Sequence, residues 1–130
     1  KGPCYIGKHS YIGNNSLIRN FSAIGPNSTV GYGSELKNCV LFGGNDIGRL
    51  SFVGDSVLGE NASTGSGLTT VNHTADYSPV ICKTDHGAVE TGLIKLGAFV
   101  GDNVKIGVRH VTGPGSILNS GSNIPDSTTL

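Results

Sequence analysis

Residues 6–36 read IGKHSY IGNNSL IRNFSA IGPNST VGYGSE L, and each six-letter group opens with an aliphatic residue. A small residue stands four positions further on in each group. The aliphatic positions are Ile6, Ile12, Ile18, Ile24, Val30 and Leu36, and the small ones are Ser10, Ser16, Ser22, Ser28 and Ser34, followed by Val40. An amphipathic helix repeats apolar residues at three and four positions and a strand at two, so a period of six fits neither alone. It predicts short strands separated by turns, with every sixth side chain in one column.

The same frame returns further along the chain. It is readable at Ile94, Val100, Ile106, Thr112, Leu118, Ile124 and Leu130, and in a shorter run at Phe52, Leu58 and Thr64. The interval from Leu36 to Phe52 is sixteen residues, so we expect a slip of two positions around residues 42–50. We predict two regular stacks, residues 6–41 and 94–130, in a β-solenoid of about seven coils whose neighbouring rungs lie about 4.8 Å apart. Gly often follows the aliphatic residue, and we expect it to supply unusual backbone angles at the corners.

A polar interruption separates the two runs. From about Thr70 to Leu93 no hexad is readable, and this segment contains His73 and His86. We predict a loop that protrudes from the solenoid near residues 72–93. Long loops in compact domains are uncommon and often functional. A catalytic loop, a disordered insertion and an arm that contacts a neighbouring subunit are the open alternatives.

The composition fits this architecture and excludes several others. The 130 residues suit one domain, 1–130, and a content of 36% apolar and 6% aromatic residues, without Met or Trp, is thin for a helical bundle or a sandwich. Nine basic and nine acidic residues give zero formal net charge, which argues against nucleic acid as a partner. No apolar run is long enough to span a membrane. Cys4, Cys39 and Cys82 suit neither a disulfide framework nor a metal spacing, so we expect reduced thiols in a cytoplasmic protein.

The aliphatic-Gly-x-x-small-x pattern resembles the hexapeptide-repeat family. The resemblance implies an all-β fold, a left-handed parallel β-helix with triangular coils of three hexads. It also implies a homotrimer with sites in the clefts between subunits. No pair of His residues a few positions apart is present, so we expect no metal site.

Three longer blocks narrow the resemblance. They are GPCYIGKHSYIGNNSLIR at 2–19, RLSFVGDSVLGENASTGSGLTTVN at 49–72 and KLGAFVGDNVKIG at 95–107. Together they resemble the C-terminal domain of archaeal-type bifunctional sugar-1-phosphate nucleotidylyltransferase/acetyltransferases. The resemblance implies acetyl transfer from acetyl-CoA to an amino-sugar phosphate. Because the chain begins at Lys1 with the repeat already running, we expect a fragment of a longer protein with an N-terminal nucleotidylyltransferase domain.

The resemblance also assigns site residues, with one important departure. The family's general base, a His three residues before the aromatic of the aromatic-x-Gly-Asp-Ser block, falls on Arg49, and the aromatic is Phe52. A guanidinium stays protonated at neutral pH and cannot act as a base, although its planar fork suits a phosphate. Asn72 matches the Asn that follows the family's coil, where a turn residue is the alternative interpretation. We assign Arg49, Phe52, Asn72 and Lys95 to substrate binding.

The remaining histidines leave one replacement base. His9 sits at an outward hexad position, and His110 takes a corner position where Ser or Ala is expected. His86 follows Asp85, and adjacent side chains in an extended chain point apart, so that pair forms no dyad. His73 follows Asn72 where the chain leaves the coil, and in the wider superfamily a loop His serves as the base. We therefore assign His73 the catalytic role.

Two functions stay open at this point. The first is an acetyl-CoA-dependent acetyltransferase domain acting on an amino-sugar phosphate. The alternative is a non-catalytic trimerisation or regulatory module of a sugar nucleotidylyltransferase. The family motifs favour the first, whereas Arg49 and Phe52 favour the second.

Overall fold

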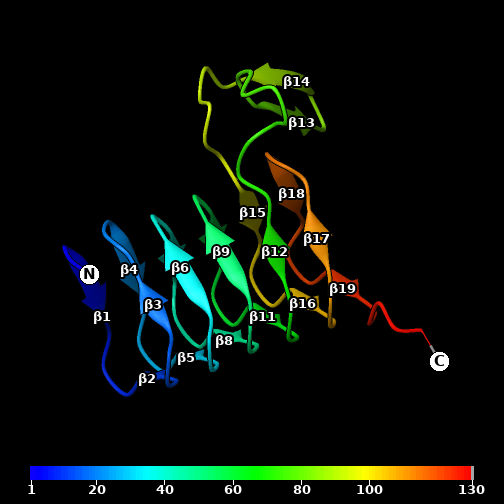
Figure 1. The fold of residues 1–130 in the computed structure, drawn as a ribbon. Helices are drawn as coiled ribbons and strands as arrows, with labels where there is room; N and C mark the ends of the chain where they lie inside the picture. The colour runs from blue at the N-terminus through cyan, green and yellow to red at the C-terminus, as the bar shows by residue number, and fades with distance from the viewer. Residues whose placement is uncertain (130) are drawn as a thin grey trace.

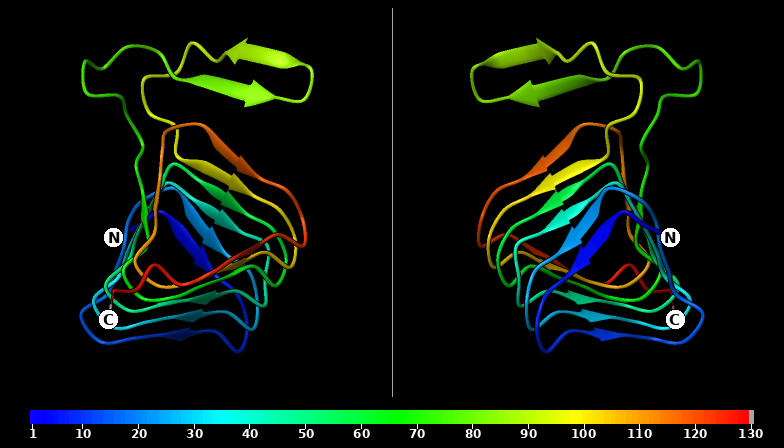
Figure 2. Two further views of the ribbon diagram at one scale, coloured as in Figure 1. Left: turned by 90° about the vertical axis from the view of Figure 1, so that its right-hand side faces the viewer. Right: turned by 90° about the vertical axis from the view of Figure 1, so that its left-hand side faces the viewer.

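The computed structural model describes residues 1–129 and shows a left-handed parallel β-helix with triangular coils (Figures 1 and 2). Three parallel sheets form the sides of the triangle, and an antiparallel hairpin stands away from one corner. The N-terminus lies at one end of the stack and the C-terminal residues at the other. The fold class expected from the hexads is thus confirmed. No helix long and apolar enough to cross a membrane occurs within these residues.

Each sheet collects every third strand of the coil, in chain order. Sheet A contains β1 (Cys4–Ile6), β4 (Ser22–Ile24), β7 (Val40–Leu41), β10 (Val57–Leu58), β15 (Ala98–Val100) and β18 (Ser116–Leu118). Sheet B contains β2 (Tyr11–Ile12), β5 (Thr29–Val30), β8 (Asp46–Ile47), β11 (Ser63–Thr64), β16 (Lys105–Ile106) and β19 (Asn123–Ile124). Sheet C contains β3 (Leu17–Ile18), β6 (Glu35–Lys37), β9 (Phe52–Gly54), β12 (Thr69–Thr70) and β17 (Val111–Thr112).

The aliphatic ladder forms most of the core, as predicted; the exceptions are Ile6, which is 46% exposed in the first coil, and Phe52 and Ile94. Its buried members are Ile18, Ile24, Val30, Leu36, Leu41, Ile47, Val53, Leu58, Val100 and Ile106. Phe52 was wrongly placed in the ladder, because Val53 is fully buried there and Phe52 lies on the outer face. Ile94 was also wrong: it is 48% exposed in the returning loop, and the second stack begins at β15. Leu130 lies outside the described residues.

The slip in the repeat has a different place from the one predicted. Register pairs are eighteen residues apart in the first coils, as in Leu17–Glu35, and seventeen apart in Glu35–Phe52. The buried ladder loses one residue between Leu36 and Leu41 and another between Val53 and Leu58. Both losses fall at the corner between sheets C and A, not around residues 42–50. A corner can lose a residue without disturbing the strands, whereas a strand cannot, because one residue would turn its side chains to the opposite face.

The glycines after the ladder residues have a different role from the expected one. Gly7, Gly31 and Gly48 are absent from the left-handed backbone region, so they do not supply the unusual angles. Instead, a Cβ atom on Gly31 would lie 2.7 Å from the Arg49 backbone nitrogen, and one on Gly48 would lie 2.3 Å from the Gly65 carbonyl carbon. The close approach of successive coils therefore requires glycine here. Positive φ occurs two residues later, often at an asparagine such as Asn15, because Asn tolerates this region better than most side chains.

The protruding segment is an ordered arm. It consists of β13 (Ile81–Thr84) and β14 (Gly87–Glu90), which pair antiparallel, and the connections to the coil on either side. Buried Val80 and Cys82 pack over Gly115, where a Cβ would lie 2.8 Å from Val80 Cγ1 and 3.0 Å from Cys82 Sγ. The arm is thus docked on the next coil of its own chain. The protrusion was predicted correctly, and its disordered alternative was wrong.

Candidate functional site

Two corners of the triangle hold the residues singled out from the sequence. The corner between sheets B and C, here called the groove corner, comprises residues 13–16, 31–34, 48–51 and 65–68 and carries Arg49. The corner between sheets C and A, here called the arm corner, comprises residues 37–39, 54–56 and the arm segment 71–97. Asn72, His73 and Lys95 belong to the arm corner. Within one chain the structure therefore separates Arg49 from these three residues.

A buried carboxylate anchors the arm corner. Asp55, whose side chain is 5% exposed, accepts hydrogen bonds from Lys37 Nζ at 2.8 Å, Asn38 Nδ2 at 2.8 Å and Asn72 Nδ2 at 2.6 Å. Burial opposes ionisation of Asp55, but these three donors outweigh it and lower the pKa of the carboxyl. The shortened corners stack these groups on one another in successive coils.

The same corner fixes both ends of the arm. The Asp55 carbonyl accepts a hydrogen bond from the Gly97 backbone at 2.8 Å, and the Asn72 carbonyl accepts one from Leu96 at 2.9 Å. The side-chain amide of Asn72 bonds Asp55 and its backbone carbonyl bonds Leu96, so Asn72 helps to hold both ends of the arm on the coil. Asn72 is buried and is not part of a turn, so its interpretation as a turn residue is wrong, and its assignment to substrate binding stays a prediction.

His73 is half-buried just after Asn72, and its ring is held from two directions. Its Nδ1 lies 2.8 Å from the Thr74 carbonyl oxygen. The ring stacks on Tyr77, with centroids 4.5 Å apart and planes 8° apart. Lys95 Nζ lies over the same Tyr77 ring, 5.5 Å from its centroid. The structure thus brings His73 and Lys95 together on Tyr77, a residue that no motif had marked.

Phe52 lies on the outer face of sheet C beside the arm corner. A Cβ on Gly54 would lie 2.5 Å from Phe52 Cζ and 3.1 Å from Asn72 Nδ2, so the ring covers Gly54 next to Asn72. The structure thus places Phe52 with the arm-corner residues. His9 is exposed, and half-buried His110 bonds the Pro125 carbonyl through Nε2, so both take the structural positions expected for them.

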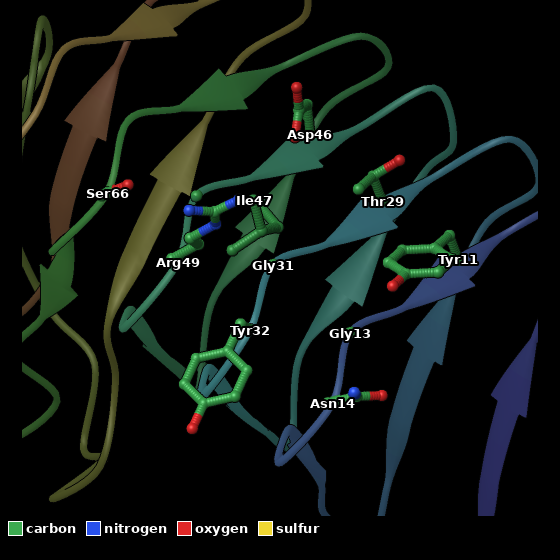
Figure 3. Close-up of a pocket in the computed structure, with 11 residues that line it drawn as sticks. Tyr11, Gly13, Asn14, Thr29, Gly31, Tyr32, Asp46, Ile47, Arg49 and Ser66 are labelled. Carbon is green, nitrogen blue, oxygen red and sulfur yellow. The ribbon is translucent and has the colours of Figure 1, made fainter.

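Arg49 lines a groove of about 390 Å³ on the other corner (Figure 3). Its lining also includes Tyr11, Asn14, Thr29, Tyr32, Asp46 and Ser66, with Gly13, Gly31 and Gly48. The sequence did not mark Tyr11 and Tyr32, because both stand at outward positions of ordinary hexads. Only the stacking of coils brings the two rings to the same groove. A repeat of eighteen residues between Gly13 and Gly31 would have indicated the shared corner.

The cysteines and acidic side chains of residues 1–129 lie apart from one another. Cys4 is exposed, Cys39 and Cys82 are buried, and all three are free thiols. Burial raises the pKa of the Cys39 thiol to about 11, which makes it a poor ligand or nucleophile. Within the part of the chain that the structure describes, no three His, Cys, Asp or Glu side chains gather closely enough to hold a metal ion.

Comparison with known proteins places this fold in a family. The model of the GMPPB C-terminal domain matches residues 1–82, which is more than half of the chain. The chain therefore belongs to the GMPPB C-terminal domain family. It is 36% identical over 90 residues to the putative uncharacterized acetyltransferase YaiX of Escherichia coli, covering 69% of this chain and 39% of that protein. It is 40% identical over 96 residues to the bifunctional protein GlmU of Methanococcus maripaludis, covering 74% of this chain and 23% of that protein.

Solved structures share the solenoid at low sequence identity. The hexapeptide transferase family protein from Anaplasma phagocytophilum matches with a TM-score of 0.68 and 17% identity, over 92% of this chain and 61% of that one. The acetyltransferase domain of PglB from Neisseria gonorrhoeae matches with a TM-score of 0.58 and 18% identity, over 98% and 48%. The chain spans well under half the length of the curated relatives it matches. It is an acyltransferase-like hexapeptide-repeat domain.

Proposed function

We propose that this domain transfers an acetyl group from acetyl-CoA to the amine of an amino-sugar phosphate, with His73 as the general base. The observation that carries the proposal is the hydrogen bond of the His73 ring. The Thr74 carbonyl can only accept, so Nδ1 carries a proton and donates it at 2.8 Å. The neutral ring then has its lone pair on Nε2. This is the tautomer that a base needs, since one nitrogen is oriented by a partner and the other can accept a proton.

The chemistry needs little more than this base and correct positions. An amino sugar arrives as an ammonium ion, and transfer of one proton to His73 Nε2 frees the nitrogen lone pair. The nitrogen attacks the thioester carbonyl, a C–N bond forms and the C–S bond breaks. The second proton of the amine passes to the departing CoA thiolate, which leaves the amide and the CoA thiol. An imidazole can mediate such transfers near neutral pH. The Tyr77 stack holds the ring plane, and Lys95, above the same ring, is available to an anionic substrate.

A trough beneath the arm supports binding of a CoA thioester. Lys83, Thr84 and His86 of the arm face Ile117 and Asn119 across a cavity of about 220 Å³. A second cavity of about 370 Å³ shares Lys83 and Ile117 and continues the trough along β18. Its apolar floor suits an extended aliphatic arm, and the Lys83 ammonium suits a phosphate.

A homotrimer completes the proposal. The outward side chains of sheet A form an uninterrupted apolar ladder in register, namely Tyr5, Ala23, Val40, Val57, Phe99 and Ile117. The equivalent ladder of sheet B is mostly polar, for example at Asp46, Ser63 and Lys105. Association through sheet A would bury this apolar face. Light scattering during size exclusion tests this, and a stable monomer would reject it.

A non-catalytic module of a sugar nucleotidylyltransferase is the second candidate, because Arg49 replaces the base of the resembled family and sheet A offers an assembly face. Either function fits a longer protein that carries a nucleotidylyltransferase domain before this one, which the bifunctional relatives support. Three unpaired cysteines support a reducing compartment such as the cytoplasm.

Release of CoA thiol from acetyl-CoA tests the reaction, with glucosamine-1-phosphate and galactosamine-1-phosphate as acceptors. We expect His73→Ala to lower the rate by about 10²–10⁴-fold, the usual contribution of a general base. His9→Ala, which changes an exposed histidine outside the arm and its trough, should keep most of the activity. Full activity in His73→Ala would reject the assignment. An inactive wild type with an active Arg49→His variant would favour the non-catalytic module.

A further inference from the structure

We infer that Asp76 is a positioning residue for His73, because it holds the turn that supplies both contacts of the His73 ring. The inference rests on the proposed role of His73 as the general base and adds what keeps that base in place. No motif marked Asp76, which is exposed in the connection between Asn72 and β13. It acts through its neighbours in the turn, residues 74–78.

The turn is organised around one oxygen atom. Asp76 Oδ1 accepts hydrogen bonds from the Ser78 hydroxyl at 2.8 Å, the Thr74 hydroxyl at 3.0 Å and the Ser78 backbone nitrogen at 3.2 Å. The bonds from Ser78, followed by the one from Thr74, lower the pKa of Asp76, so the carboxylate stays ionised at neutral pH. An Asp side chain that bonds the backbone two residues further on is a frequent way to close a turn. Asp76 Oδ1 thus joins the two sides of this one.

The turn needs this support because Tyr77 has a left-handed backbone conformation. Its φ is +57°, in a region that residues other than Gly, Asn and Asp seldom adopt. On one side the Tyr77 nitrogen donates to the Thr74 carbonyl at 3.1 Å, and on the other side Ser78 is bonded to Asp76. The conformation of Tyr77 sets the direction of its ring, which lies against His73 with the two planes 8° apart.

The Thr74 carbonyl couples the turn to the tautomer of His73. It accepts the bond from the Tyr77 nitrogen at 3.1 Å and lies 2.8 Å from His73 Nδ1. A carbonyl oxygen has two lone pairs, so it can accept both bonds at once. The atom that closes the turn is therefore also the atom that selects the Nδ1–H form of the ring and leaves the lone pair on Nε2.

His73 is thus held at its edge and at its face by one turn. The Thr74 carbonyl holds the edge, and the Tyr77 ring, at a centroid distance of 4.5 Å, holds the face. Lys95 lies 5.5 Å from the centre of the Tyr77 ring, within the range of about 6 Å for a cation–π contact. Loss of the Asp76 bonds should release both contacts of His73 together.

The geometry requires an acceptor atom at position 76. All three bonds end on Oδ1, and an asparagine would offer a carbonyl oxygen at the same place without the negative charge. Asp76→Asn should therefore preserve the position of His73, whereas Asp76→Ala should release it. This pair of variants separates the hydrogen-bond acceptor from the charge.

Nitrogen-15 NMR of the histidine rings tests the inference without a substrate. At about pH 8, above the ordinary range for histidine, two-bond ¹H–¹⁵N correlations show which ring nitrogen carries the proton. We expect a single Nδ1–H tautomer of His73 in the wild type and in Asp76→Asn. In Asp76→Ala we expect a mixture of tautomers like that of the exposed His9 and His86, which serve as internal references.

The acetyl-transfer assay gives a second measurement. Asp76→Ala should lower kcat by about ten- to a hundredfold and change KM by less than about threefold, because a misplaced base slows the chemical step without removing a contact to the substrate. Glu90→Ala is the matched control, since it truncates another exposed acidic residue of the arm, outside the cavities beneath it. It should change neither the rate nor the tautomer of His73.

Two outcomes would overturn the inference. One is a single Nδ1–H tautomer of His73 retained in Asp76→Ala, and the other is a Glu90→Ala variant that changes as much as Asp76→Ala. Thermal melting shows whether each variant is folded. Ser78→Ala removes the shortest of the three bonds and should shift the tautomers in the same direction, so it keeps the test valid if Asp76→Ala is unfolded.

The NMR measurement also separates this inference from the proposed function. A protein that transfers no acetyl group but shows the expected tautomers in the wild type and in both Asp76 variants would reject the proposed function and support the positioning of His73 by Asp76. An active protein whose His73 tautomer and kcat are unaffected in Asp76→Ala would support the proposed function and reject the role of Asp76.

Discussion

The groove corner and the arm corner are both built from the six-residue repeat, but they hold successive coils together in different ways. At the groove corner, bare glycines let the backbones of neighbouring coils approach closely, and the outward side chains remain free. At the arm corner, two turns are one residue shorter, and a buried carboxylate collects three donors before the chain leaves the coil. The repeat is thus stabilised at the groove corner by close backbone contact and by serine hydroxyls that bond the next coil, whereas the corner that carries the arm also has a buried ionic anchor.

Removing that anchor should have the largest effect. Asp55→Ala leaves Lys37, Asn38 and Asn72 without their shared acceptor, and loss of one partner of a buried charged cluster costs about 3–5 kcal/mol. Chemical denaturation measures this free energy of unfolding. The control is Asp46→Ala, which changes an exposed carboxylate on strand β8 beside the groove corner and should stay within about 0.5 kcal/mol. Equal effects at both positions would contradict the difference between the corners.

Adding a methyl group to a glycine tests the close approach of neighbouring coils at the groove corner. Gly31→Ala places a Cβ 2.7 Å from the Arg49 backbone nitrogen and should destabilise the protein by about 1–3 kcal/mol through overpacking. Gly113→Ala is the matched variant, since Gly113 also follows a ladder position, at the arm corner, and its nearest neighbour would be 3.9 Å away. We expect little loss there. If both variants melt at the same temperature, close approach is not what requires glycine.

Loosening the arm itself should act locally. Val80 is 1% exposed where it packs over Gly115, and Val80→Ala should cost about 1 kcal/mol in lost burial. Hydrogen exchange should then rise across β13 and β14 and remain unchanged in the sheets of the coil. Residues 13–16 and 31–34 of the groove corner, which are far from the arm in sequence and lie on another corner, serve as the internal reference. Faster exchange throughout the coil would show that the arm is part of the core.

Acid should weaken the arm corner selectively. The pKa of Asp55 is lowered in the folded protein, so its stabilising effect is present above the ordinary Asp range, near pH 4, and is lost as the pH falls through the lower folded value. The difference in melting temperature between wild type and Asp55→Asn should therefore shrink from pH 7 to pH 3. A constant difference over this range would mean that the charge of Asp55 contributes little.

Much of the fold could be predicted from the sequence, because a six-residue period of apolar side chains indicates a β-solenoid and fits neither a helix nor a simple strand. The regular hexads of residues 6–36 identified the coil, the ladder and the small corner residues, and Ser28 and Ser34 indeed bond the carbonyls of corner glycines. Phe52 was misplaced because the repeat loses one residue at two separate corners. In a sequence, two single deletions on either side of Phe52 look the same as one slip of two between Leu36 and Phe52.

The candidate sites were only partly readable. His73 and Asn72 were marked by position and by family pattern, and Arg49 by its departure from that pattern. Tyr77 and the Asp55 anchor could not be recognised, because their contacts depend on how the arm folds back and how shortened corners stack. Tyr11 and Tyr32 belong to different coils, and nothing in either hexad relates one ring to the other.

The sequence by itself determined the solenoid, its buried ladder and the place where the arm leaves the coil. The reason is that the strands of successive coils pair with the same period as the hexads. The tertiary structure alone decided which outward side chains share a corner. It separated Arg49 from His73, turned Asn72 inward to Asp55, and brought Tyr11 and Tyr32 into one groove with Arg49. The physical reason is that the buried side chains are fixed by their own hexad, whereas each outward side chain acquires its neighbours from the coils above and below, and the exact length of every corner sets that alignment.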